Sequence, residues 1–131
     1  MEAKSYPGEI SGLGCKASSV KSLSMIEEAL RRTRDWLGVP EEKKEVWIGS
    51  LYQTANRLAH LYFFNQVVRR PVWFLNVCFL DDSTATHSTS RDEWDGPLTE
   101  AEEELGIADR TVPNTVYVFL KAREHQELCS R

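Results

Sequence analysis

The sequence lacks the long apolar run that a membrane-spanning helix requires. Its longest apolar stretch, PVWFLNVCFL, is interrupted by Asn76 and is far shorter than the roughly 20 residues that cross a bilayer. The first residues include Glu2 and lack the apolar segment of a secretory signal. Both absences predict a cytoplasmic protein that has no membrane partner.

The sequence has few cysteines, and their spacing does not suggest disulfide pairs. Cys15, Cys78 and Cys129 are odd in number, lie far apart, and form no Cys-x-x-Cys pair. This spacing argues against a disulfide framework and against a zinc site. We expect three reduced thiols.

Internal repeats and low-complexity tracts are also absent. The 131 residues are 41% hydrophobic and 27% charged, which are ordinary values for a globular protein. This length suits one domain with a modest core. The sequence therefore predicts a single domain over residues 1–131.

The charge is distributed unevenly around a net value of −4. Residues 1–70 carry 11 Lys and Arg against 8 Asp and Glu, whereas residues 71–131 carry 5 against 12. An acidic protein binds polyanions poorly in general, so net charge does not support a nucleic-acid partner. A local phosphate-facing surface on the basic half and a simply solvated charge distribution both stay open.

The apolar periodicity predicts an α/β layered fold. Strands are expected over residues 1–6, 72–80 and 115–121, and helices over 20–37, 46–68 and 90–105. The continuous apolar strand 72–80 is typical of the middle of a sheet that is covered on both faces. Alternating strands and helices thus predict a mixed sheet with helices on both faces. The polar tail REHQELCSR is expected to fray.

The helix predicted over residues 46–68 has an unusual polar face. Gln53, Asn56, Arg57 and His60 lie opposite its apolar stripe, where a solvated helix would normally carry Glu and Lys. These four side chains offer directed hydrogen bonds. They form either a buried polar network or the lining of a binding site, for a small molecule or an anion.

The first strand carries an acid and a base two residues apart. Side chains at positions i and i+2 of a strand point to the same side, so Glu2 and Lys4 should lie together. Such a pair is either an exposed ion pair or part of a functional site.

The tripeptide EAK at residues 2–4, followed by a loop and long helices, resembles the second half of the PD-(D/E)XK nuclease motif. The segments YQTANRLAHLYFF, PVWFLNVCFLDD and HSTSRDEW resemble an uncharacterised group of bacterial proteins with a restriction-endonuclease-like core. The resemblance covers residues 2 to about 120.

This resemblance implies roles at the matching positions. Glu2 would be a carboxylate ligand of Mg²⁺ or Mn²⁺, and Lys4 would lie beside the attacking water. Gln53 would line the catalytic site. Asn56, Arg57 and His60 would contact phosphate or orient the ion.

The second acid of that motif, an Asp on the preceding strand, has no counterpart here. Only Met1 precedes Glu2, which predicts a core truncated at its N-terminus and a chain that is inactive unless the acid is supplied. Asp81 and Asp82, at the end of a predicted strand, are candidate substitutes. Two functions follow from this. One is a relative of metal-dependent phosphodiesterases with an incomplete site; the other is a non-catalytic module that binds a partner or forms a homodimer that completes its sheet.

Overall fold

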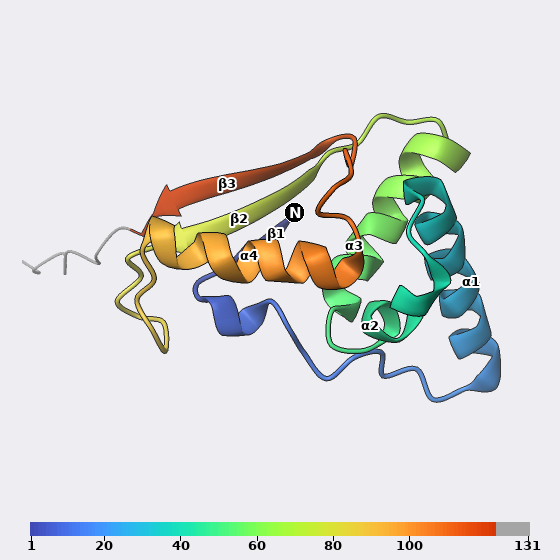
Figure 1. The fold of residues 1–131 in the computed structure, drawn as a ribbon, viewed down its shortest axis with the longest axis horizontal. Helices are drawn as coiled ribbons and strands as arrows, with labels where there is room; N and C mark the ends of the chain where they lie inside the picture. Colours follow the sequence, from blue (N-terminus) through green and yellow to red (C-terminus); the bar gives the residue numbers. More distant parts are fainter. Residues whose placement is uncertain (123–131) are drawn as a thin grey trace, which may run out of the picture.

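The computed structural model describes residues 1–122 (Figure 1). Its elements in chain order are β1 (Glu2–Lys4), η1 (Pro7–Glu9), α1 (Val20–Leu37), η2 (Glu41–Lys43), α2 (Lys44–Ile48), α3 (Tyr52–Tyr62), η3 (Phe63–Val67), β2 (Phe74–Leu80), α4 (Arg91–Leu105) and β3 (Thr115–Lys121). None of the helices in these residues has the length and apolar character needed to cross a bilayer. The predicted tail, which includes Cys129, lies outside the described residues.

The three strands form one sheet in the order β1-β2-β3, and both strand pairs are parallel. The apolar strand β2 is therefore central, as its sequence predicts, and the mixed α/β class is confirmed. Parallel neighbours need long crossover connections, and here helices supply them. The expectation of a mixed sheet is wrong for the strands described.

The helices cover only one face of this sheet. Phe74, Cys78 and Tyr117 project from that face toward α3 and α4 and belong to the apolar core or pack against it. In Figure 1 the helices lie below and to the right of the strands. Side chains of the other face, such as Val77 and Val118, are not part of the core cluster. Within residues 1–122, the prediction of helices on both faces is therefore wrong.

Local sequence signals explain the bounds of the two longest helices. At the start of α1 the side chain of Ser19 accepts a hydrogen bond from the Ser22 amide, and Gly38 ends this helix in a left-handed conformation at φ 70°. A reciprocal capping box of Ser90 and Glu93 starts α4. The helix then continues through Pro97 to Leu105.

The helix predicted over residues 46–68 is divided into α2, α3 and the π-helical turn η3. The break falls at Gly49, whose backbone angles of φ −95° and ψ −123° are not helical. A Cβ atom there would lie 2.6 Å from the Glu45 carbonyl oxygen, so this backbone path requires glycine. The break lets α3 lie against the sheet while α2 packs against α4.

Two buried tryptophans fix α4 over the sheet. The Trp47 indole, fully buried in α2, donates a hydrogen bond of 2.9 Å to the carbonyl of Leu105. The indole of Trp94, also fully buried, donates a bond of 3.0 Å to the carbonyl of Phe79 in β2. Because each indole combines a large apolar surface with one satisfied donor, both ends of α4 are held in place.

Candidate functional site

The strand register gathers polar side chains on the helix-covered face of the sheet. Glu2 pairs with Asn76, and Asn76 pairs with Tyr117, so these three residues form one row across the strands. Lys4 and Cys78 lie in the adjacent row. Buried strand faces are normally apolar, which makes this polar row the most unusual feature of the interior.

Glu2 and Lys4 form a buried ion pair. The Lys4 Nζ lies 2.8 Å from Glu2 Oε1, and each side chain is only 9% exposed. The prediction that the two side chains share one side of the strand is confirmed. The second carboxylate oxygen, Glu2 Oε2, is buried and has no hydrogen-bond partner among residues 1–122. A buried charged oxygen gains from a hydrogen-bond donor, so Oε2 is a candidate contact atom for a ligand.

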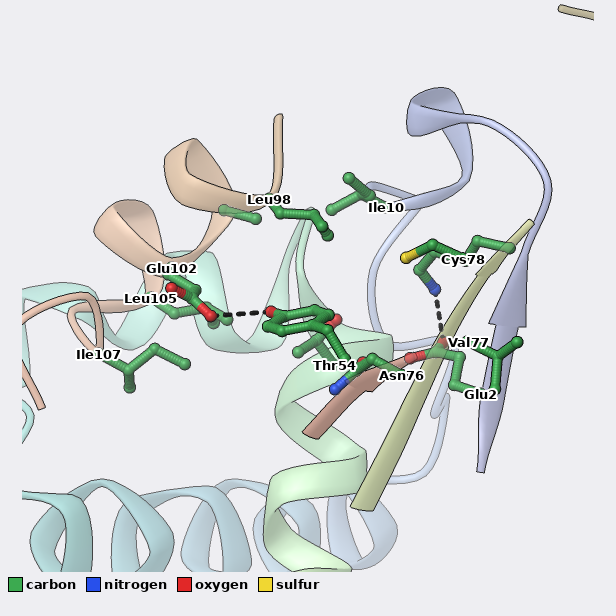
Figure 2. A pocket seen from close by; sticks show the side chains of 13 residues that line it. Glu2, Ile10, Thr54, Asn76, Val77, Cys78, Leu98, Glu102, Leu105 and Ile107 are labelled. Atoms are coloured by element: carbon green, nitrogen blue, oxygen red, sulfur yellow. Dashed lines mark hydrogen bonds and ion pairs between the residues drawn. The ribbon is translucent and has the colours of Figure 1, made fainter. Parts of the chain in front are cut away.

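A small cavity of ≈ 30 Å³ lies against this ion pair. Figure 2 shows Glu2, Asn76 and Cys78 facing Leu98, Glu102 and Leu105 across it. Thr54 of α3 also lines the cavity. The volume holds about one water-sized group.

Tyr117 and Glu102 form the second polar contact of the cavity. The Tyr117 hydroxyl donates a hydrogen bond of 2.8 Å to Glu102 Oε1 (Figure 2). Burial raises the pKa of Tyr117 well above its ordinary value, and the neighbouring Glu102 carboxylate raises it further. Tyr117 therefore acts as a neutral donor, not as a phenolate. Burial also raises the pKa of the Cys78 thiol, although Lys4 and Arg91 partly oppose this effect.

A larger cleft of ≈ 320 Å³ adjoins the cavity. The cavity and the cleft share five lining residues, namely Thr54, Asn76, Glu102, Ile107 and Tyr117. The rest of the cleft includes apolar side chains and the exposed Arg110, whose Nε donates to the Gly106 carbonyl. Asn76 and Tyr117 of the polar row thus line both the inner cavity and the adjoining cleft.

The polar face predicted for α3 does not reach this cavity. Gln53, Arg57 and His60 are exposed and Asn56 is half-buried, and none of the four lines the cavity. Within residues 1–122, the one hydrogen bond that involves their side chains joins His60 Nδ1 to the Asn56 carbonyl oxygen at 2.7 Å. The helix instead turns Thr54 toward the sheet. The catalytic and phosphate-binding roles implied for the four residues stay predictions.

Asp81 and Asp82 lie away from the ion pair. Glu2 is level with Asn76, and the five residues from Asn76 to Asp81 correspond to about 16 Å along a strand. Asp82 accepts hydrogen bonds from the amide and hydroxyl of Thr84, which lower its pKa, so it serves as a turn residue. Neither Asp supplies the second acid beside Glu2.

The donors around Glu2 do not fit a divalent ion well. One carboxylate oxygen of Glu2 is already paired with an ammonium group, and residues 1–122 contain no cluster of three or more His, Cys, Asp or Glu side chains suited to a metal. Mg²⁺ requires a near-octahedral shell, for which this cavity offers little room. Mg²⁺ or Mn²⁺ binding at Glu2 stays a prediction, and no chemical step is derived from it.

A half-buried polar network that was not predicted from the sequence joins η3 to the sheet. Asn65 donates to the carbonyls of Leu61 and Val72 and accepts from the Val72 amide. The Asn114 side chain donates to Asn65 and to Val72. The available signal was Asn114, which directly precedes the apolar strand β3. Backbone groups at the start of a strand that are not paired with another strand need side-chain hydrogen-bond partners.

We expect Asn65→Ala to lower the free energy of unfolding by about 1–3 kcal/mol, because the Val72 amide loses its side-chain acceptor and the carbonyls of Leu61 and Val72 each lose one donor. Asn56→Ala is the matched control, since that side chain makes no hydrogen bond within residues 1–122 and the change should stay within about 0.5 kcal/mol. Urea denaturation of both variants measures the difference. Equal losses would contradict the assignment of the network to Asn65.

These features define a mixed α/β protein with a three-stranded parallel sheet, helices on one face and a buried Glu–Lys pair. Comparison with protein-family models, with curated proteins and with solved structures gives no match to this chain.

Proposed function

We propose that this chain is a non-catalytic module that associates with a second copy of itself through the open face of its sheet. The open face consists of side chains that point away from α3 and α4: Ala3, Leu75, Val77, Phe79, Val116, Val118 and Leu120. On β3, Val116 is 38% exposed and Leu120 46% exposed, whereas Val77 on the central strand is only 7% exposed. This exposed apolar face is the observation that carries the proposal.

The parallel architecture of the sheet indicates that another surface covers the open face. Parallel sheets occur almost only with both faces covered, because their strands are apolar on both sides. Within the described residues, helices cover one face of the sheet. A covering surface from outside these residues would bury the exposed apolar groups.

The chemistry of the open face favours a second copy as the occupant. Its seven side chains include no charge, so two identical faces can meet around a twofold axis without like-charge repulsion. An acidic or basic partner would find no complementary charge there. The contact is thus expected to be isologous and apolar.

The size of the face sets the expected strength of association. A seven-residue strand is about 23 Å long and three strands span about 14 Å, which gives a face of roughly 300 Å². A standard interface buries about 800 Å² per partner. We therefore expect a weak, concentration-dependent dimer and not a permanent one.

Metal-dependent phosphodiester hydrolysis is a second proposal, supported by the position of Glu2 and Lys4 side by side on β1. The enclosure of the pair weighs against it, since a cavity of ≈ 30 Å³ cannot admit a phosphodiester without rearrangement. Mn²⁺-dependent cleavage of DNA that is abolished by Glu2→Gln would move this proposal to first place.

We expect the wild-type chain to dimerise weakly, with the fraction of dimer rising with protein concentration, because the open face is smaller than a standard interface. The double variant Val116→Glu/Leu120→Glu should remain a monomer, because both new charges would be buried in the contact. Met25→Glu is the matched control, since Met25 is 66% exposed on α1, away from the sheet. Sedimentation equilibrium over a range of protein concentrations measures all three.

Two results would overturn the proposal. One is a wild-type chain that stays at 15.0 kDa at millimolar concentration. The other is a double variant that associates as strongly as the wild type. That second result would direct attention to the edge of β3, which within residues 1–122 pairs only with β2.

A further inference from the structure

One oxygen of the buried Glu2 carboxylate is free to accept a further hydrogen bond within the described residues. Its Oε1 is paired with Lys4 at 2.8 Å, whereas its Oε2 is buried and has no hydrogen-bond partner in the part of the chain that the structure describes. The side chain is 9% exposed and lines the cavity of ≈ 30 Å³ (Figure 2). A hydrogen-bond donor that entered this cavity and reached Oε2 would satisfy it.

The charges around the cavity select the kind of donor. Glu2 and Glu102 contribute two negative charges and Lys4 one positive charge, so the three lining groups carry a net charge of −1. A single positive charge would neutralise the set, whereas a divalent ion would leave an excess of one. Arg110 lies farther out, in the adjoining cleft, and is exposed to solvent.

The shape of the two spaces selects the size of the ligand. The inner cavity holds about one water-sized group, which matches a primary ammonium head. The adjoining cleft of ≈ 320 Å³ is lined in part by Leu58, Phe74 and Val112, which suit an apolar body. Thr54, Asn76 and Tyr117 border both spaces and offer further oxygen acceptors for an ammonium group.

From these observations we propose that the cavity and cleft bind a small primary alkylammonium ion, with its head on Glu2 Oε2 and its chain in the cleft. The site lies on the helix-covered face of the sheet, opposite the open face, and does not depend on dimer formation. The ammonium head supplies the donor that Glu2 lacks. The apolar side chains of the cleft add burial of the alkyl chain.

The test is an NMR titration of the ¹⁵N-labelled full chain at low concentration with n-butylammonium chloride. Butan-1-ol and sodium butyrate serve as probes of the same shape that lack the positive charge. We expect saturable shifts of the β1 and β2 amides with n-butylammonium, and at least tenfold weaker binding of the other two probes. Glu2→Gln should weaken n-butylammonium binding at least tenfold.

Two more variants provide a second test of the site and a control. Glu102→Gln, which can still accept from Tyr117, should also weaken binding several-fold and serves if Glu2→Gln fails to fold. Glu103→Gln, its exposed neighbour on α4, should bind within twofold of the wild type. No saturable shift in the wild type, equal binding of butan-1-ol, or unchanged affinity in a folded Glu2→Gln or Glu102→Gln variant would overturn the proposal.

Discussion

Replacing Lys4 with methionine is expected to lower the free energy of unfolding by about 3–5 kcal/mol. The ammonium group of Lys4 lies 2.8 Å from Glu2 Oε1, and the two side chains are each 9% exposed. Removing the lysine leaves a buried carboxylate with no partner for either oxygen within the described residues 1–122. The loss therefore reflects an uncompensated charge more than the lost attraction of the pair.

A double variant separates these two contributions. Glu2→Gln/Lys4→Met removes both charges and keeps similar volumes, so we expect its stability to approach that of the wild type. Lys121→Met is a matched control, because Lys121 is 79% exposed and lies 3.9 Å from Asp81. That change should stay within about 0.5 kcal/mol. Urea denaturation that shows equal effects for Lys4→Met and Lys121→Met would contradict the buried pair.

Replacing Trp47 with alanine should cost about 3–5 kcal/mol through the cavity it leaves. The indole is fully buried and bonded to the Leu105 carbonyl, which would lose its donor and add to the loss. Small domains have a total stability of about 5–15 kcal/mol, so this single change approaches the limit for folding. Thermal unfolding should show a large fall in Tm.

Trp73→Ala is the control for this prediction. Trp73 immediately precedes β2 and is 63% exposed, so its removal should change the free energy of unfolding by about 0.5 kcal/mol or less. A comparable loss in both variants would show that Trp47 does not hold α2 against α4. An unfolded Trp47→Ala beside a folded Trp73→Ala agrees with the structure.

The secondary structure was predictable where local chemistry determines it. The bounds predicted for the helix at residues 20–37 match α1, because an N-terminal serine cap and Gly38 define its ends. The break inside residues 46–68 was not predictable in the same way. Gly49 fits a helix poorly, but only the close approach of the Glu45 carbonyl makes the non-helical path necessary.

The candidate site was predictable in part. The i, i+2 spacing of Glu2 and Lys4 placed both on one side of β1. The polar face of α3 lies opposite its buried stripe, and Gln53 and Arg57 on that face are exposed. The partners Asn76 and Tyr117 depend on strand register, which the sequence of one strand does not contain.

The open face could not be anticipated from hydropathy. Val116, Val118 and Leu120 alternate with Tyr117 and Phe119, and all five are apolar or aromatic, as in a strand buried on both sides. Apolar character alone does not say which covering layer comes from the same chain. Only the arrangement of α3 and α4 on one side of the sheet reveals the uncovered face.

The most direct test of the central claim is an isotope-filtered NOE experiment on a mixture of labelled and unlabelled chains at millimolar concentration. If two open faces meet, the methyl groups of Val116, Val118 and Leu120 should show intermolecular NOEs, and those of Met25 and Leu30 on α1 should show none. Intermolecular NOEs confined to α1, or none at all at this concentration, would contradict association through the open face.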